Sequence, residues 1–538
     1  MKQSLISMAA LLAVLFGCNK EPQNVLPDEN GQKALIQVDV KTAGTLTKAP
    51  GTYEYGSAKE NAVSSLKFYF FKADGNPYSV VSGSNEISWK QSEGETAESV
   101  EKISDVILVI KQSEVAPPAK VVAVLNDATD YANFDLATLA SKVITSLHTD
   151  KTNFVMSNAV YYDTDTKAVM VASEITQDNI FTVTDSEFVR KYNAGSSVSS
   201  ADIPEGVSIN PIDIYVERVA AKVRVKGAEG VNLEKLPVYA EDGKTQMKDA
   251  FGNVVYAKIL GWNITNCTDE AYLLKNVEAS WTDASLGFAW NNPAHFRSYW
   301  TKTTDAPVHP HSFTALAGRD VVTEDYYFEN THSTEHAQLL VAAQLVNEEG
   351  AAIQLAKWYN VLYTIADLKT AMINTVATKL YVKDAAWTDA NKVYRSVTTE
   401  DVTFYQVPVT TETKRYEVKV AVKEGVQYFY ADGTAYEANK PEEILDNIAP
   451  AQMWTDGSAY YYTEIKHFGS EGKAGEFGIV RNHVYDVTLS GVKGFGTPVY
   501  DPELVIIPER TEKQEALNLA AQINILSWHL VAQDVTLQ

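Results

Sequence analysis

Alternation of apolar and polar residues with a period of two is the feature that most constrains how this chain can fold. Successive side chains of a β-strand point to opposite faces, so such alternation predicts a half-buried antiparallel strand. The alternation recurs in three stretches: Ile36 to Val40, Leu66 to Phe70, and Val219 to Val225. Val121 to Leu125 is apolar at every position and precedes the turn-forming pair Asn126-Asp127, which predicts a strand covered on both faces. The sequence therefore predicts a mainly β protein.

Helical periodicity is confined to short segments. One helical face is expected to begin near a cap at Asp130 or Asn133 and to carry Leu136, Leu139, Ala140, Val143 and Leu147. A second helix is expected from Ile365 to Val376, and Pro441 is expected to open a third at its first turn. Turn residues separate strands at roughly 8 to 12 residue spacing, which favours antiparallel β-sandwiches over a parallel α/β sheet.

The length of 538 residues exceeds what one hydrophobic core usually holds, so we expect two domains. The polar, glycine-containing stretch from Gly227 to Lys235 is the candidate boundary between them. We therefore expect an N-terminal β-sandwich domain over residues 49–228 and a C-terminal β-sandwich domain over residues 229–518.

The N-terminus has the pattern of a lipoprotein signal peptide over residues 1–17. Lys2 precedes an apolar run from Leu5 to Phe16 that is too short to cross a bilayer, and Cys18 follows Leu-Phe-Gly directly. A cysteine at this position can form a thioether to diacylglycerol before cleavage, so we expect lipid on Cys18. The alternatives are a transmembrane segment and ordinary cleavage beside an incidental cysteine.

Charge and cysteine content exclude two further classes of protein. The net charge of −23 repels phosphate backbones, so nucleic acid is not an expected partner. Cys18 and Cys267 are the two cysteines, and a lipidated Cys18 leaves Cys267 without a partner in the chain. Disulfides are therefore not expected to hold the fold, and Cys267 is expected to be a small buried hydrophobe.

Six short motifs, in order along the chain, resemble the fimbrillin family of type V pili, in particular the major subunit of the short fimbriae. Each motif alone is weak, but their order is specific, and they span nearly the whole chain. They are Val121 to Asp127, Phe154 to Ser157, Val216 to Val223, Tyr327 to Thr331, Gly478 to Val487, and Ile523 to Trp528.

The resemblance implies two transthyretin-like β-sandwich domains in a lipoprotein precursor that matures into a pilus subunit. Lys48 lies in a Gly/Pro/Thr-rich loop that a trypsin-like protease can reach, and related fimbrillins are cut near here, usually at Arg. Cutting would make Ala49 the new N-terminus and release residues 18–48, the lipidated tether with a removable N-terminal strand. The implied partners are identical subunits, fimbrial anchor and tip subunits, the maturation protease, and the outer membrane through the lipid. No cofactor is implied.

The C-terminal segment, residues 519–538, is the candidate donor strand for polymerisation. Ile523 and Ile525 share one phase of alternation, Trp528 has the other, and the first phase returns at Val531, Val535 and Leu537. The phase change predicts either two short strands or one strand with a bulge near Ser527. A strand added to the open edge of another chain is β-augmentation. The alternative is that the tail is the last strand of its own domain.

Other patterns leave alternatives open. The segment His332 to His336 matches the H-x-x-E-H pattern of inverted zincins, but its neighbours predict a loop before a strand at Leu339 to Val346. His309 and His311 flank a proline without an evident third ligand. A sugar-stacking surface could use the aromatic residues Tyr460, Tyr461, Tyr462, Trp281, Trp300 and Trp454.

Three functions therefore compete: a structural pilus subunit, a surface glycan-binding lipoprotein, and an anchored hydrolase. We find no G-x-S-x-G nucleophile motif and no phosphate-cradling glycine loop, and no residue is assigned as catalytic, cofactor-binding or metal-binding. The motifs favour the structural subunit at the cell surface.

Overall fold

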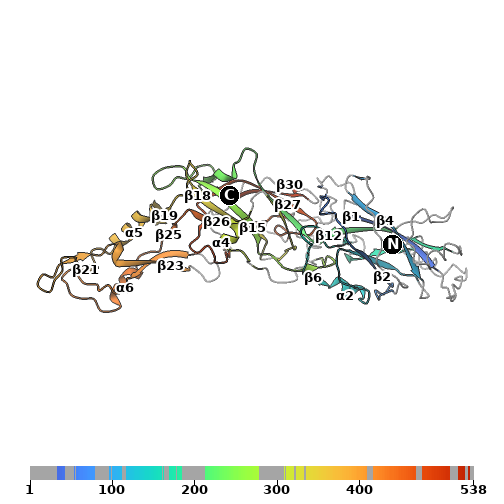
Figure 1. The fold of residues 1–538 in the computed structure, drawn as a ribbon, viewed down its shortest axis with the longest axis horizontal. Coiled ribbons are helices and arrows are strands. Elements are labelled where there is room, and N and C mark those ends of the chain that lie inside the picture. The colour runs from blue at the N-terminus through green and yellow to red at the C-terminus, as the bar shows by residue number, and fades with distance from the viewer. Residues whose placement is uncertain are drawn as a thin grey trace, which may run out of the picture. The chain divides into compact units, whose positions relative to one another are not determined.

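The computed structural model describes a large part of the chain, shown as a ribbon in Figure 1. The described residues are 33–42, 54, 56–78, 96–97, 100–111, 117–159, 161–162, 169–176, 179–183, 212–240, 242–277, 308, 310–319, 323–332, 335–408, 416–467, 475–508, 519–526 and 531–532. No helix in these ranges is long and apolar enough to cross a membrane.

The chain divides into two compact units between Val219 and Ala220. The first unit comprises Met1–Lys48, Tyr55–Val219 and Tyr272–Val277, and the second comprises Ala49–Glu54, Ala220–Ala271 and Glu278–Gln538. The division therefore precedes the boundary expected at 228/229. The reason is that the strand from Ala221 to Gly227 pairs with strands of the second unit, so it cannot close the first.

In its described residues, the first unit forms short and long strands and the short helix α2 (Leu136–Ala140). Its strands are β1 (Lys33–Thr42), β2 (Leu66–Phe71), β3 (Thr96–Ala97), β4 (Val100–Lys111), β5 (Lys120–Leu125), β6 (Val143–Ile144), β7 (Met156–Asn158), β8 (Tyr161–Tyr162), β9 (Val169–Met170), β10 (Ser173–Glu174), β11 (Ile180–Val183) and β12 (Ile212–Arg218).

The main sheet of the first unit has the strand order β10-β5-β7-β12-β1-β4-β3, with β2 paired to β5 and β11 paired to β1. Residues 121–125 of β5 are all buried, as their apolar run predicts, and the strand ends at Asn126, which has a positive φ of 60°. The prediction of a half-buried β2 is wrong, because every residue of β2 except Lys67 is buried.

Helix α2 is shorter than the periodicity predicts. Its N-cap is Asp135, whose side chain accepts a hydrogen bond from the Thr138 backbone N–H at 2.7 Å, so the expected caps Asp130 and Asn133 are wrong. The helix ends at Ala140 because Val143 leaves the helical path and enters β6. A five-residue helix cannot carry the full apolar face that the sequence pattern suggests.

In the described residues of the second unit the helices are α4 (Phe313–Ala317), α5 (Ile365–Asn374) and α6 (Lys440–Asp446), with 3₁₀ turns η3 (Leu233–Lys235) and η7 (Thr399–Asp401). Its strands are β13 (Ala221–Gly227), β14 (Leu236–Tyr239), β15 (Tyr256–Thr265), β17 (Glu324–Tyr327), β18 (Gln338–Val346), β19 (Leu355–Trp358), β20 (Val361–Tyr363), β21 (Tyr381–Lys383), β22 (Tyr394–Ser396), β23 (Val402–Pro408), β24 (Tyr416–Val422), β25 (Gln452–Trp454), β26 (Ser458–Glu464), β27 (Val484–Lys493), β28 (Thr497–Pro498), β29 (Leu519–Leu526) and β30 (Val531–Ala532). The short strand β16 (Ala271–Tyr272) lies at the point where the chain returns to the first unit.

The large sheet of the second unit has the order β17-β13-β27-β14-β15-β18-β26-β28, and β29 pairs with β27. Its core lies around Trp262, Tyr461 and Tyr485, all fully buried. Strand β13 runs parallel to β27, and β14 does the same. In the first unit β1 runs parallel to β12. Purely antiparallel pairing is therefore a wrong expectation for these three pairs.

The segment between β18 and β26 forms a hydrophobic core of its own within the second unit. Helix α5 and helix α6 pack there with β19, β24 and β25 around buried residues that include Leu368, Met372 and Leu445. The helix predicted from Ile365 is confirmed, with Thr364 as N-cap, and Pro441 lies in the first turn of α6 as predicted. Helix α4 is not indicated by the sequence pattern.

The mainly β architecture with a few short helices confirms the predicted fold class (Figure 1). Transthyretin-like topology, which the resemblance implies, stays a prediction. Strand β15 shows the expected period of two: its first six residues alternate between intermediate exposure and burial.

Candidate functional site

Strand β1 lies inside the sheet of the first unit, with both of its edges paired. One edge pairs with β4 along the whole strand, from Lys33 opposite Lys111 to Thr42 opposite Glu101. The other edge pairs with β11 over residues 33–36 and with β12 over residues 38–42. Removing β1 would therefore leave two facing rows of unpaired backbone groups.

The register of β1 relates its alternating positions to the core. Positions 38 and 40 pair with Ile212 and Ile214, which are 4% and 0% exposed. Directly paired residues of neighbouring strands share a face of the sheet, so these two positions lie on the face that carries the core. A strand that replaces β1 must supply apolar residues at alternate positions.

The C-terminal tail forms two strands within the second unit. Strand β29 pairs antiparallel with β27, and β30 pairs antiparallel with β29. Of the two alternatives for the phase change in the tail, the two-strand form is the one observed. Ile523 lies opposite Val487 and Ile525 opposite Tyr485, and both partners on β27 are fully buried.

A buried ion pair lies just before β27. Arg481 and Glu329 have side chains that are 0% and 3% exposed, and Arg481 Nε donates to Glu329 Oε1 at 2.9 Å. Beside this pair, the backbones of Asn330 and Ile479 exchange two hydrogen bonds of 2.9 Å. The motifs Tyr327 to Thr331 and Gly478 to Val487 therefore meet in space.

The same junction includes the start of β13. Asn482 has a positive φ of 58° and its backbone N–H donates to Ala220 O at 2.7 Å, while the Lys222 N–H donates to His483 O at 2.9 Å. Tyr485 Oη accepts the Val480 N–H at 2.8 Å, and burial raises the pKa of this phenol. Three motifs thus join around the first residues of β27, the strand that carries β29.

In the first unit the motifs also meet. The Asn126 side chain accepts from the Ser64 N–H at 2.7 Å and donates to Phe154 O at 2.9 Å. Strand β7 pairs with β5 and with β12, so Val121 to Asp127, Phe154 to Ser157 and the start of Val216 to Val223 form one cluster. The motif residues that the structure describes are therefore structural positions within the two sheets.

Residues 452–534 match the family model described as "Major fimbrial subunit protein type IV, Fimbrillin, C-terminal". Over this region the chain is similar to the C-terminal part of fimbrillins. The match includes β27, β29 and β30, so the strand pair near the end of the chain belongs to the matched segment. No curated protein matches the chain.

Several solved structures resemble this chain at low identity. A fimbrilin from Porphyromonas gingivalis is 12% identical at a TM-score of 0.38, covering 93% of this chain and 98% of that one. The tip fimbrial protein Mfa3 of the same organism is 10% identical at 0.28, covering 91% and 100%. A fimbrial assembly protein from Parabacteroides distasonis is 9% identical at 0.29, covering 74% and 99%. TM-scores this low carry no argument, and the likeness to fimbrillins rests on residues 452–534.

The structure reaches only some of the residues predicted to act in processing and assembly. Cys18, Lys48 and Ala49 lie outside the described residues, as do Trp528, Val535 and Leu537. Ile523 and Ile525 lie in β29, and Val531 lies in β30 opposite Ile525.

The candidate zincin motif forms no metal centre in the part of the chain that is described. His332 Nδ1 accepts the Glu335 N–H at 3.0 Å, and His336 Nδ1 lies 2.8 Å from Glu464 Oε1. Both histidines lie in the loop before β18, as the sequence predicts. No group of three or more His, Cys, Asp or Glu side chains in the described ranges could hold a metal ion.

Three of the aromatic residues suggested for sugar stacking are buried: Trp454, Tyr460 and Tyr461 are 2%, 5% and 0% exposed, because β25 and β26 pack into the core. Tyr462 has intermediate exposure, so it is the one placed member of the set that reaches the surface. Trp281 and Trp300 lie outside the described residues. Sequence reasoning missed the Arg481–Glu329 pair, although two charged residues inside apolar motifs were a usable signal.

Proposed function

We propose that this protein is a structural subunit of a cell-surface fimbria, placed in the shaft, and that it polymerises by strand exchange in support of adhesion. The family match over residues 452–534 supports a fimbrial role. The observation that carries strand exchange is the position of β1. This strand is paired on both edges, so its removal leaves a slot in the sheet that has a strand on each side.

The subunit is made as a lipoprotein precursor with lipid on Cys18, and it reaches the outer membrane through that lipid. A trypsin-like protease cuts after Lys48, which separates β1 and the lipid from the body and leaves Ala49 as the new N-terminus. The loss of β1 opens a slot ten residues long between β4 on one side and β11 and β12 on the other. Unpaired backbone groups buried along this slot favour the entry of a new strand.

The strand that enters is β29 of another subunit. It is eight residues long, and its alternating Ile523 and Ile525 meet the requirement that Ile212 and Ile214 set. About five buried apolar side chains from the tail contribute on the order of 10 kcal/mol gross, before ordering costs. Strand β29 already pairs with β27 of its own unit, so strand exchange replaces the β29–β27 pairing by pairing with the strands beside the slot. The net free energy of exchange is the difference between the free energies of these two pairings.

This arrangement gives the precursor a resting form. With β1 in its sheet and β29 on β27, neither the slot nor the tail is open to another chain, so polymerisation waits for the cut at Lys48. Other partners are the anchor and tip subunits of the same fimbria and the protease itself.

The experiment is limited trypsin treatment of the purified full chain, with electron microscopy and N-terminal sequencing before and after. The proposal predicts filaments only after treatment, built from chains that begin at Ala49. An intact N-terminus in filaments, or a start at Asn61 after a cut at Glu60, contradicts the site. A cut at Lys59 keeps the mechanism and moves the site.

The lipid is tested separately with Cys18→Ser. This variant should accumulate as an unprocessed precursor that reaches the surface poorly, because stable anchoring requires the acyl chains. Mass spectrometry of the membrane fraction measures the lipid, and normally processed, lipid-free Cys18→Ser protein in fimbriae contradicts the assignment.

A further inference from the structure

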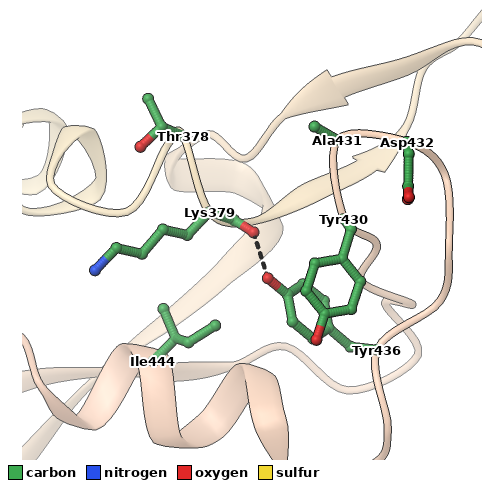
Figure 2. Close-up of a pocket in the computed structure, with 7 residues that line it drawn as sticks. All are labelled: Thr378, Lys379, Tyr430, Ala431, Asp432, Tyr436 and Ile444. Carbon is green, nitrogen blue, oxygen red and sulfur yellow. Dashed lines mark hydrogen bonds between the residues drawn. The ribbon is translucent and has the colours of Figure 1, made fainter.

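A pocket of about 450 Å³ lies in the segment between β18 and β26, far in sequence from the terminal strands. It is lined by Thr378, Lys379, Tyr430, Ala431, Asp432, Tyr436 and Ile444 (Figure 2). The volume is within the range of pockets that bind small molecules, roughly 300 to 1,000 Å³. The lining combines aromatic and aliphatic surface with hydroxyl, ammonium and carboxylate groups.

A tight turn fixes two of the lining side chains. The Tyr430 N–H donates to Thr434 O at 2.8 Å and the Gly433 N–H donates to Tyr430 O at 3.0 Å. Gly433 has a φ of 83°, and a Cβ added to it would lie 2.5 Å from the Tyr394 ring, so glycine is required there. The turn therefore holds Tyr430 and Asp432 in defined positions.

Two tyrosines form a rigid aromatic layer in the pocket. The rings of Tyr430 and Tyr436 stack with centroids 3.7 Å apart at an angle of 30°. Tyr436 Oη donates to Lys379 O at 2.7 Å, which anchors the inner ring (Figure 2). Tyr430 is 44% exposed, so the outer ring offers a flat apolar face beside the pocket.

Polar groups flank this aromatic layer. Figure 2 shows Lys379 and Ile444 on one side of the tyrosines and Asp432 on the other. Asp432 Oδ1 accepts the Thr434 N–H at 2.9 Å, and this hydrogen bond holds the pKa of Asp432 below its usual range, so the carboxylate is ionised at neutral pH. The second oxygen of Asp432 is an acceptor for a ligand hydroxyl, and the ammonium group of Lys379, on the other side of the tyrosines, is a donor.

We propose that this pocket binds a neutral hexopyranose unit of a glycan, with the apolar C–H face of the sugar ring on Tyr430. Asp432 accepts hydrogen bonds from sugar hydroxyls, and Lys379 and Thr378 donate to sugar oxygens. A pyranose uses the flat apolar face and the flanking donors and acceptors at the same time, and one cation with one anion around the pocket suits a neutral ring. This inference goes beyond the assembly role and does not depend on it.

The test is saturation-transfer difference NMR on the purified full chain with methyl β-D-galactopyranoside and methyl β-D-glucopyranoside, followed by titration. The proposal predicts transfer to the ring protons of at least one glycoside. Binding should weaken at least tenfold in Tyr430→Ala and in the isosteric Asp432→Asn. The matched control is Tyr359→Ala, because Tyr359 is 71% exposed in the turn between β19 and β20 and should leave binding unchanged.

Three results would overturn the proposal. The first is no transfer from the natural chain to either glycoside. The second is transfer that persists unchanged in both Tyr430→Ala and Asp432→Asn. The third is methyl β-D-glucuronide binding more tightly than both neutral sugars, which would contradict a neutral ring. Asp432→Asn keeps the turn acceptor, so it reports on binding even if Tyr430→Ala fails to fold.

Discussion

Arg481 and Glu329 form an ion pair that is withdrawn almost completely from solvent, at the point where three sequence motifs meet before β27. Removing one partner leaves the other charge buried without an opposite charge beside it. We therefore expect Arg481→Leu to destabilise the second unit by about 3–5 kcal/mol, since the buried carboxylate keeps the backbone N–H of residue 481 but loses the guanidinium that balances its charge. Urea unfolding monitored by tryptophan fluorescence measures the change.

A matched control is the exposed pair of Lys235 and Glu348, whose Nζ and Oε1 atoms lie 2.6 Å apart. Glu348→Gln should leave the unfolding midpoint unchanged, because solvent screens an exposed pair. Equal effects of Arg481→Leu and Glu348→Gln would show that the buried pair does not stabilise the motif junction.

Gly261 should not tolerate a side chain. A Cβ at this position would lie 1.9 Å from Leu316 O of α4, so the helix must move away from β15. We expect Gly261→Ala to lower the free energy of unfolding by about 1–3 kcal/mol. Gly318→Ala is the control, because its Cβ would meet Thr314 O at an ordinary 3.7 Å and its φ is −84°. The measurement is the thermal unfolding midpoint of each variant. Equal midpoints for Gly261→Ala and Gly318→Ala would contradict the close contact between Gly261 and Leu316.

Cys267 should react slowly with alkylating reagents. The sequence predicts a buried small hydrophobe, whereas the structure places the thiol at intermediate exposure, with Sγ 3.4 Å from Ile264 O. Burial raises the pKa of Cys267 from 9.0 to about 11, so at pH 8 the reactive thiolate is about a hundredfold scarcer than for an ordinary thiol. Iodoacetamide labelling followed by mass spectrometry should be slow for the folded chain and fast in urea. Equal rates in both conditions would contradict the burial.

Local sequence patterns were sufficient to predict an element where its identification does not require knowing which strand it pairs with. The apolar run of β5 and the helix starting at Ile365 depend on neighbouring residues and on turn chemistry, while the sequence left open whether the tail forms two strands or one bulged strand. Alternation also indicated strands at Leu35 to Val40 and at Ile523 to Leu526, although it could not give their partners.

Non-local relationships were not predictable in the same way. Alternation cannot tell that β1 runs parallel to β12, or that β13 belongs to the second unit, because parallel and antiparallel strands share a period of two. The same holds for the pocket beside Tyr430 and Tyr436, whose lining residues come from three separated stretches of sequence.

The most direct test of strand exchange is a disulfide that locks β29 onto β27 of its own subunit. Thr488 and Gln522 lie opposite each other in this pair, and directly opposed Cα atoms in antiparallel strands are roughly 4.5–5.5 Å apart, within disulfide range. The variant is Thr488→Cys with Gln522→Cys in a Cys267→Ser background, and Thr488→Cys alone is the control.

Electron microscopy after limited trypsin treatment compares the oxidised and the reduced forms of this double variant. The account predicts filaments from the reduced protein and from the single-variant control, and none from the oxidised protein, because a locked β29 cannot enter the slot left by β1. Abundant filaments from the oxidised, trypsin-treated protein would contradict the claim that β29 is the donor strand.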